Sequence, residues 1–105
     1  MTPERTQAAL DECRERIDVV DRRIVMLLNE RARVVEVIGE LKQSQQMRVY
    51  EPRREEAVFA NITRNNGGPL RPDALKRIYE RIIDEMRTLQ RDRMAASKPK
   101  PDQEA

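Results

Sequence analysis

Histidine is absent from this 105-residue sequence, and cysteine occurs once, as Cys13. Without histidine the chain can form neither a Ser-His-Asp or Cys-His nucleophile system nor an imidazole site for a metal. A single cysteine forms neither an internal disulfide nor a thiolate zinc cage, and it is typical of a reducing compartment. The missing residue types therefore exclude several catalytic classes and favour a cytoplasmic location.

Glycine and aromatic residues are also scarce, with three of each. This composition argues against a β-sandwich or barrel, which needs turn residues and ring-rich strands. No apolar run approaches the ~20 residues of a membrane span, and the first residues lack the apolar region of a signal peptide. Apolar residues make up 38% of the chain, below the ~45–50% of an average globular domain. We therefore expect one soluble domain with a thin core and no membrane partner.

Charged residues, by contrast, are abundant. The chain has 21 Lys and Arg against 19 Asp and Glu, for a net charge of +2. Because the two signs alternate along the chain, they indicate a solvated helical surface more than a nucleic-acid-binding patch. We therefore expect no nucleic-acid partner.

Residues 6–43 contain no proline and one glycine, Gly39. Two adjacent heptad stripes run through this segment: Cys13, Val20, Leu27, Val34 and Leu41 on one, and Arg14, Ile17, Asp21, Ile24, Leu28, Arg31, Val35, Ile38 and Lys42 on the other. Such spacing predicts one long amphipathic helix, about 57 Å in length. A compact chain of this size has a gyration radius of only ~13 Å. The helix is too long to bury its stripe within one chain, so we expect it to form a homodimer.

Two shorter helices follow a polar connector at 43–50. Pro52 suits the first turn of a short helix over 51–64, and the Asn-Asn-Gly-Gly-Pro segment 65–69 ends it. Pro72 then begins a helix of medium length. Its apolar stripe holds Leu75, Ile78, Tyr79, Ile82, Ile83, Met86, Leu89 and Gln90. The sequence therefore predicts an all-α fold with one long, one short and one medium helix per chain.

The last residues differ in composition from the rest. Residues 95–105 have no hydrophobic periodicity and include two prolines. We therefore expect a helical domain over 1–94 and a disordered C-terminal tail over 95–105.

Three cations, Arg14, Arg31 and Lys42, lie on an otherwise apolar stripe, and Gln90 lies on the stripe of the third helix. Charged side chains are seldom buried without partners. A single cation on this stripe has two ordinary explanations. Its side chain extends from the edge of the stripe to water, or it pairs with an acidic residue of the same or the second helix. Taken together with Gln90, the three indicate an anion pocket inside a helical bundle.

Helix geometry limits which cations share this pocket. Arg31 and Lys42 are about 16 Å apart along the axis, so two long side chains could hold one small molecule between them. Arg14 is about 25 Å from Arg31 and cannot share that molecule within one chain. If two copies of the long helix pair antiparallel about a two-fold axis near residues 22–23, Arg14 of the partner subunit lies beside Arg31. The dimer would then carry two composite pockets.

Several segments carry a resemblance to a known family. They are Leu10–Asp18, Leu27–Arg31, Val37–Lys42, Val49–Glu55 and Ile78–Ile83. In order and spacing the chain resembles, over roughly residues 7–93, the small all-helical chorismate mutases. These include the domains fused to prephenate dehydratase, prephenate dehydrogenase or DAHP synthase. The resemblance implies an intertwined homodimeric helical bundle in which the long helix spans both halves.

The resemblance also implies roles for individual residues. Arg31 and Arg14 of the partner subunit resemble the arginines that grip the two substrate carboxylates, a task suited to a planar guanidinium. Lys42 and Gln90 resemble the pair that faces the ether oxygen of the breaking bond. With Arg31, they are the expected catalytic residues.

Three further residues belong to the expected binding site by resemblance. Glu55 resembles the acceptor for the ring hydroxyl of the substrate, and Arg54 a neighbouring pocket cation. Glu51 stands where several family members carry the shorter Asp.

The reaction implied is the intramolecular Claisen rearrangement of chorismate to prephenate in the biosynthesis of Phe and Tyr. It requires positioning and charge stabilisation, with no nucleophile, proton transfer, metal or cofactor. A DAHP synthase or another shikimate-pathway enzyme is a candidate partner. Two alternatives remain at this point: an isochorismate-pyruvate lyase of the same fold, and a helical dimerisation module without catalytic activity.

Overall fold

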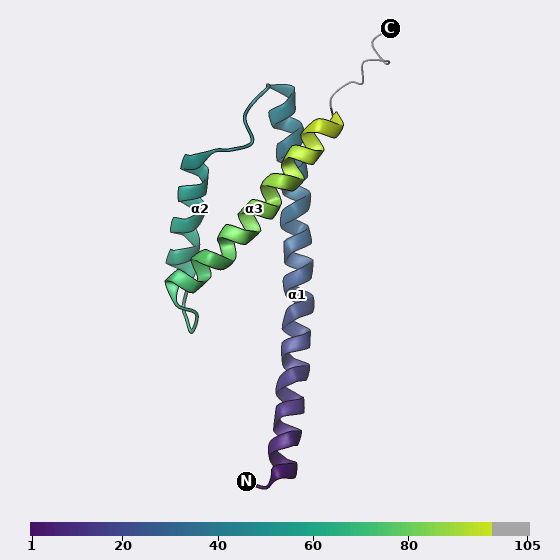
Figure 1. Cartoon of the computed structure of the whole chain (residues 1–105), viewed down its shortest axis with the longest axis vertical. Helices are drawn as coiled ribbons and strands as arrows, with labels where there is room; N and C mark the ends of the chain where they lie inside the picture. The colour runs from purple at the N-terminus through teal and green to yellow at the C-terminus, as the bar shows by residue number, and fades with distance from the viewer. Residues whose placement is uncertain (98–105) are drawn as a thin grey trace. The chain divides into compact units, whose positions relative to one another are not determined.

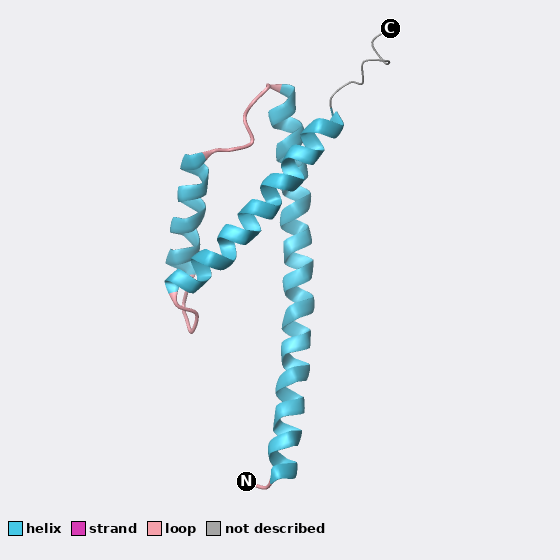
Figure 2. Ribbon diagram, in the orientation of Figure 1, coloured by secondary structure: helices cyan, strands magenta, loops and turns pink. Residues whose placement is uncertain are grey.

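The computed structural model describes residues 1–97, which form three helices and no strand (Figures 1 and 2). They are α1 (Pro3–Ser44), α2 (Pro52–Asn65) and α3 (Pro72–Ser97). Each begins with proline, whose missing N–H has no helical partner in the first turn anyway. The expected all-α chain with one long, one short and one medium helix is confirmed. None of the three helices combines the length and hydropathy that a membrane span requires.

The chain divides into two compact units, residues 1–33 and the residues from Val34 onward. The first unit is the N-terminal part of α1. Thr2 begins it, accepting a hydrogen bond from the Arg5 backbone N–H at 3.2 Å through Oγ1, as an N-cap residue does.

Apolar side chains of the first unit are exposed. Ile17 is 56% exposed, Ile24 47% and Leu27 62%. These residues belong to the predicted stripes, and exposed apolar side chains grouped in this way are typical of an interaction face. Within its own unit the stripe has no cover.

The core of the chain lies in the second unit. Val35 of α1 and Ile83 and Met86 of α3 are its buried apolar residues. Gly39 permits a close approach between α1 and α3. A Cβ atom there would lie 3.3 Å from the backbone oxygen of Gln90 and 3.4 Å from its Cγ.

A tight turn ends α1. The Met47 N–H donates to the Lys42 carbonyl at 2.8 Å, and the Gln46 N–H donates to the Gln43 carbonyl at 3.2 Å. Gln46 has a φ of 54°. Together these features form a Schellman motif with a non-glycine residue in the left-handed position. The connector is thereby folded back over the last turn of α1.

The C-terminal boundary differs from the prediction. Helix α3 continues to Ser97, whereas the domain was expected to end at 94 and the tail to begin at 95. Ala95 and Ala96 extend the helix because alanine has the highest helix propensity. The remainder of the predicted tail, 98–105, lies outside the described residues.

Candidate active site

The centre of the candidate site is the buried ammonium group of Lys42, whose residue is 6% exposed. Its Nζ atom lies 3.0 Å from the Val49 carbonyl oxygen, 2.8 Å from Gln90 Oε1 and 2.6 Å from Glu51 Oε1. An ammonium has three N–H donors, and each has an acceptor here. The structure therefore brings together three of the residues singled out in the sequence, Lys42, Glu51 and Gln90. One lies at the end of α1, one precedes α2 and one is on α3.

The three acceptors of Lys42 differ in charge and exposure. Glu51 supplies the negative charge, but its side chain is 45% exposed, against 8% for Lys42. Glu51 is also the N-cap residue of α2, yet its side chain makes no capping hydrogen bond. Because a half-exposed carboxylate is readily solvated, it is the acceptor that an entering ligand displaces at least cost.

Gln90 presents a second donor group beside Lys42. It is 7% exposed and accepts a hydrogen bond from Lys42 through Oε1. Its two Nε2 N–H groups are therefore the donors that remain. The close approach at Gly39 fixes the position of Gln90 against α1. A cation and a neutral amide donor thus lie next to each other in a mostly buried environment.

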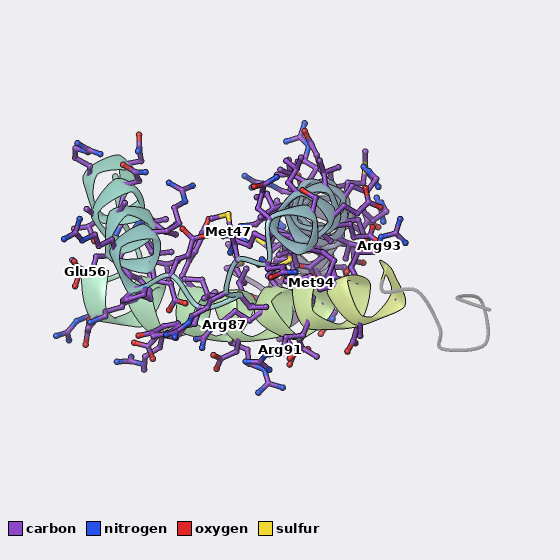
Figure 3. The ribbon with its side chains drawn as sticks, turned by 90° about the horizontal axis from the view of Figure 1, so that it is seen from above. Met47, Glu56, Arg87, Arg91, Arg93 and Met94 are labelled. Atoms are coloured by element: carbon purple, nitrogen blue, oxygen red, sulfur yellow. The ribbon has the colours of Figure 1, made fainter. Side chains whose placement is uncertain are left out.

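An ion pair between Glu40 and Arg93 also joins α1 and α3. Arg93 donates to Glu40 Oε1 from Nε at 3.0 Å and from Nη2 at 2.5 Å; Figure 3 labels Arg93 on α3. This hydrogen bond, together with the charge of Glu40 and more weakly that of Glu36, raises the pKa of Arg93 above its ordinary value. The pair keeps the end of α3 against α1 while both groups remain hydrated.

A second acidic residue of the predicted site, Glu55, lies one turn into α2. Its Oε2 atom is 3.3 Å from Nε of Arg87, and the two side chains are 21% and 28% exposed. Arg87 also contacts Asp84 Oδ1 through Nη2 at 2.8 Å, and its guanidinium lies 5.5 Å from the centre of the Tyr50 ring. Sequence reasoning did not single out Arg87. The available signal was its position three residues before Gln90, which places both on one face of α3.

The other predicted site residues are three arginines. Arg54 is exposed on α2. Arg14 is exposed on α1, with Nη1 3.8 Å from Asp11 Oδ1. Arg31 is half-buried and, like Arg14, belongs to the first unit. The roles of these three arginines stay predictions.

Metal ligands do not gather in the described part of the chain. Across residues 1–97, no three His, Cys, Asp or Glu side chains are placed to hold a metal ion. The donors that lie together are the Lys42 ammonium and the Gln90 amide, and two such groups in fixed positions suit the stabilisation of negative charge on a bound molecule.

Sequence comparisons identify similar proteins. The sequence model of the family described as chorismate mutase type II matches residues 13–91. A bifunctional chorismate mutase/prephenate dehydratase of Aquifex aeolicus is 38% identical over 86 residues, which cover 78% of this chain and 24% of that protein. The protein of the same name from Neisseria gonorrhoeae is 40% identical over 78 residues, covering 74% and 21%. The chain thus spans about a quarter of the length of these curated relatives.

Solved structures provide a comparison of similar length. Form II of the chorismate mutase from Thermus thermophilus superposes with a TM-score of 0.77 at 31% identity, covering 79% of this chain and 94% of that one. Form I of the same enzyme gives a TM-score of 0.72 at 32% identity, with coverage of 74% and 98%.

Proposed function

Because the chain belongs to the chorismate mutase type II family, a family of isomerases, we propose that it converts chorismate to prephenate. In this intramolecular Claisen rearrangement the ether C–O bond breaks while a C–C bond forms, and negative charge grows on the ether oxygen. The observation that carries the proposal is the buried Lys42 ammonium in direct contact with Gln90. Fixed donors aimed at an oxygen that becomes negative stabilise the transition state more than the substrate.

Lys42 and Gln90 have complementary tasks in this proposal. The ether oxygen takes the place of the Glu51 carboxylate on Lys42 Nζ, while the Gln90 amide donates a second hydrogen bond. Because Lys42 is almost fully buried, its charge acts with little screening by water. The neutral amide donates at any pH, so we expect a flat activity profile near neutrality.

Glu51, Arg54 and Glu55 complete the substrate-binding side of the proposal. Glu55 accepts a hydrogen bond from the ring hydroxyl, and Glu51, released from Lys42, lies one helical turn away. Arg54 contributes positive charge at the mouth of the site. The position of Glu55 on the same end of α2 as Glu51 supports this assignment.

We also propose an intertwined homodimer in which Arg14 of the partner subunit and Arg31 bind the two substrate carboxylates. The exposed apolar side chains of the first unit support it, since a second copy of the helix would cover them. The test mixes refolded Arg14→Ala and Arg31→Ala chains, each inactive alone. Every heterodimer would contain one intact site, so an equal mixture should regain about a quarter of the wild-type activity. No recovery would contradict the shared site.

The biological setting follows the same reasoning. We propose a cytoplasmic enzyme of Phe and Tyr biosynthesis that requires no cofactor. The fusion of chorismate mutase with prephenate dehydratase in the relatives supports a place beside other shikimate-pathway enzymes, a DAHP synthase among them. The comparisons do not favour the lyase or the non-catalytic dimerisation module.

The direct test is product identification. Purified protein is incubated with chorismate and, separately, with isochorismate, and prephenate and pyruvate are quantified. The proposal predicts prephenate from chorismate in equal amount to the substrate consumed. Pyruvate release from isochorismate without prephenate formation would instead indicate the lyase, and no turnover of either would indicate the dimerisation module.

A further inference from the structure

Arg87 occupies a defined place next to the proposed site. Glu51 and Glu55 are four residues apart at the start of α2, so they share one face of that helix. Arg87 and Gln90 are three residues apart and share one face of α3. Glu51 reaches Gln90 through Lys42, and Glu55 reaches Arg87 directly. The two helices thus run antiparallel here and are joined at two successive levels. The contact between Glu55 and Arg87 lies about one helical turn away from Lys42 and Gln90.

The contacts of Arg87 hold its guanidinium from three sides. Asp84 binds Nη2 at 2.8 Å from the preceding turn of α3, and the ring of Tyr50 lies 5.5 Å away. Nε lies 3.3 Å from Glu55 Oε2. The Nε atom is buried and makes no hydrogen bond, so its interaction with Glu55 is a charge contact. A planar fork that also stacks on an aromatic face has a fixed orientation, which an ammonium on a flexible stem lacks. In Figure 3 the Arg87 side chain extends toward α2.

The contact joins Arg87 Nε to Glu55 Oε2. It is a charge contact that leaves the carboxylate able to accept a hydrogen bond from a ligand, since a carboxylate has about four lone-pair sites. Because both side chains are mostly buried, their attraction is less screened than that of a surface pair. A carboxylate held in this way accepts a hydrogen bond without first losing side-chain freedom.

We propose that Arg87 is a positioning residue that orients Glu55 toward the ring hydroxyl of the substrate and so sets the affinity for hydroxyl-bearing substrates. This inference rests on the proposed mutase function. A hydroxyl contact is made in both the bound substrate and the transition state, so its loss raises KM and leaves kcat nearly unchanged. The reacting atoms are served by Lys42 and Gln90, whereas the polar and ring contacts of Arg87 in the described residues are with Glu55, Asp84 and Tyr50.

The test is a double-mutant cycle of Arg87→Met and Glu55→Gln, with kcat and KM measured on chorismate. Arg87→Met should raise KM about tenfold with kcat within about threefold of wild type. The change weakens the hydrogen bond between Glu55 and the substrate hydroxyl, and it leaves the contacts of Lys42 and Gln90 with the transition state in place. Arg87→Lys should restore part of the affinity, since it keeps the charge but not the fork. In the Glu55→Gln background, Arg87→Met should have no further effect on KM.

Arg91→Met is the matched control. Arg91 is exposed one turn later on α3 and points away from α2 in Figure 3, so this change should leave KM unchanged. Circular dichroism confirms that each variant is folded; if Arg87→Met does not fold, the cycle is run with Arg87→Lys.

The outcomes separate the two proposals. A wild-type protein that does not convert chorismate overturns the proposed function and this role with it. Wild-type turnover combined with an unchanged KM in Arg87→Met overturns the role of Arg87 alone. The same follows if the effect persists undiminished in the Glu55→Gln background, or if Arg91→Met reproduces it.

Discussion

Replacing Gln90 with glutamate changes one N–H donor group into a carboxyl of almost the same shape. Gln90 is 7% exposed, and its amide oxygen lies 2.8 Å from Lys42 Nζ. Gln90→Glu can therefore keep the contact with Lys42, so the fold should be retained. The introduced carboxyl donates a hydrogen bond to the ether oxygen only while it is protonated.

The size of the effect follows from the fraction that is protonated. With an ordinary carboxyl pKa of about 4.3, roughly one molecule in a thousand carries the proton at pH 7.5, and about one in sixteen at pH 5.5. The nearby ammonium lowers this pKa and burial of the carboxyl raises it, so the two shift the curve in opposite directions along the pH axis. Loss of one fixed donor typically reduces kcat by about 10²–10³-fold. We therefore expect Gln90→Glu to be at least a hundredfold slower than wild type at pH 7.5.

The assay follows chorismate consumption at saturating substrate from pH 5 to 8. For Gln90→Glu, kcat should rise on acidification, by up to about tenfold per pH unit, and level off at high pH at the residual rate that remains without the donor, whereas wild type should vary little. The secondary structure of both proteins is checked at each pH by circular dichroism. A folded Gln90→Glu variant with a flat profile at near wild-type rate would refute the assignment of Gln90 as the donor. A steep acid dependence in the wild type would refute it equally.

The packing of the second unit makes two further predictions. Gly39→Leu should destabilise the protein by about 1–3 kcal/mol through overpacking and lower kcat by displacing Gln90, whose backbone oxygen lies 3.3 Å from the added Cβ. Gly67→Ala, with open space around its Cβ, should leave kcat unchanged. Ile83→Ala should cost about 2–5 kcal/mol in urea unfolding at fixed protein concentration because Ile83 is buried. Ile78→Ala, on a residue 48% exposed, should cost much less, and equal losses would contradict the assigned core.

The fold was largely predictable because its signals are local. Proline at the first position marks the start of each helix, and the stripe along 6–43 marks α1. These patterns depend on helix geometry alone. The end of α3 was less predictable, because Ala95 and Ala96 carry high helix propensity without adding to an apolar stripe.

The candidate site was predictable to the extent that polar residues interrupt apolar faces. Lys42 and Gln90 were visible in this way, and the structure places them in contact. The turn at Gln46 that brings the connector back to Lys42 left no signal, since glutamine seldom adopts a positive φ. This turn is held by hydrogen bonds to the carbonyls at the end of α1, and these acceptors are in place only once the helix has formed.

Arg87 could not be singled out for a different reason. It is one of 21 basic residues, most of them on solvated helix faces, and its partners lie on three separate segments. Pairing across helices depends on the register between α2 and α3, which periodicity within one helix does not specify. Arg14 and Arg31 illustrate a related limit, since their proposed shared site needs a second chain.

The most direct test of the central claim compares kcat of wild type and Lys42→Met at saturating chorismate, with prephenate quantified as the product. Methionine keeps the length of the buried stem but removes the ammonium that contacts Gln90 and Glu51. We predict a folded protein whose kcat is lower by at least 10²–10³-fold, the loss typical of a fixed donor at a developing negative charge. A folded Lys42→Met variant that forms prephenate within about threefold of the wild-type rate would contradict the proposed catalytic role of Lys42.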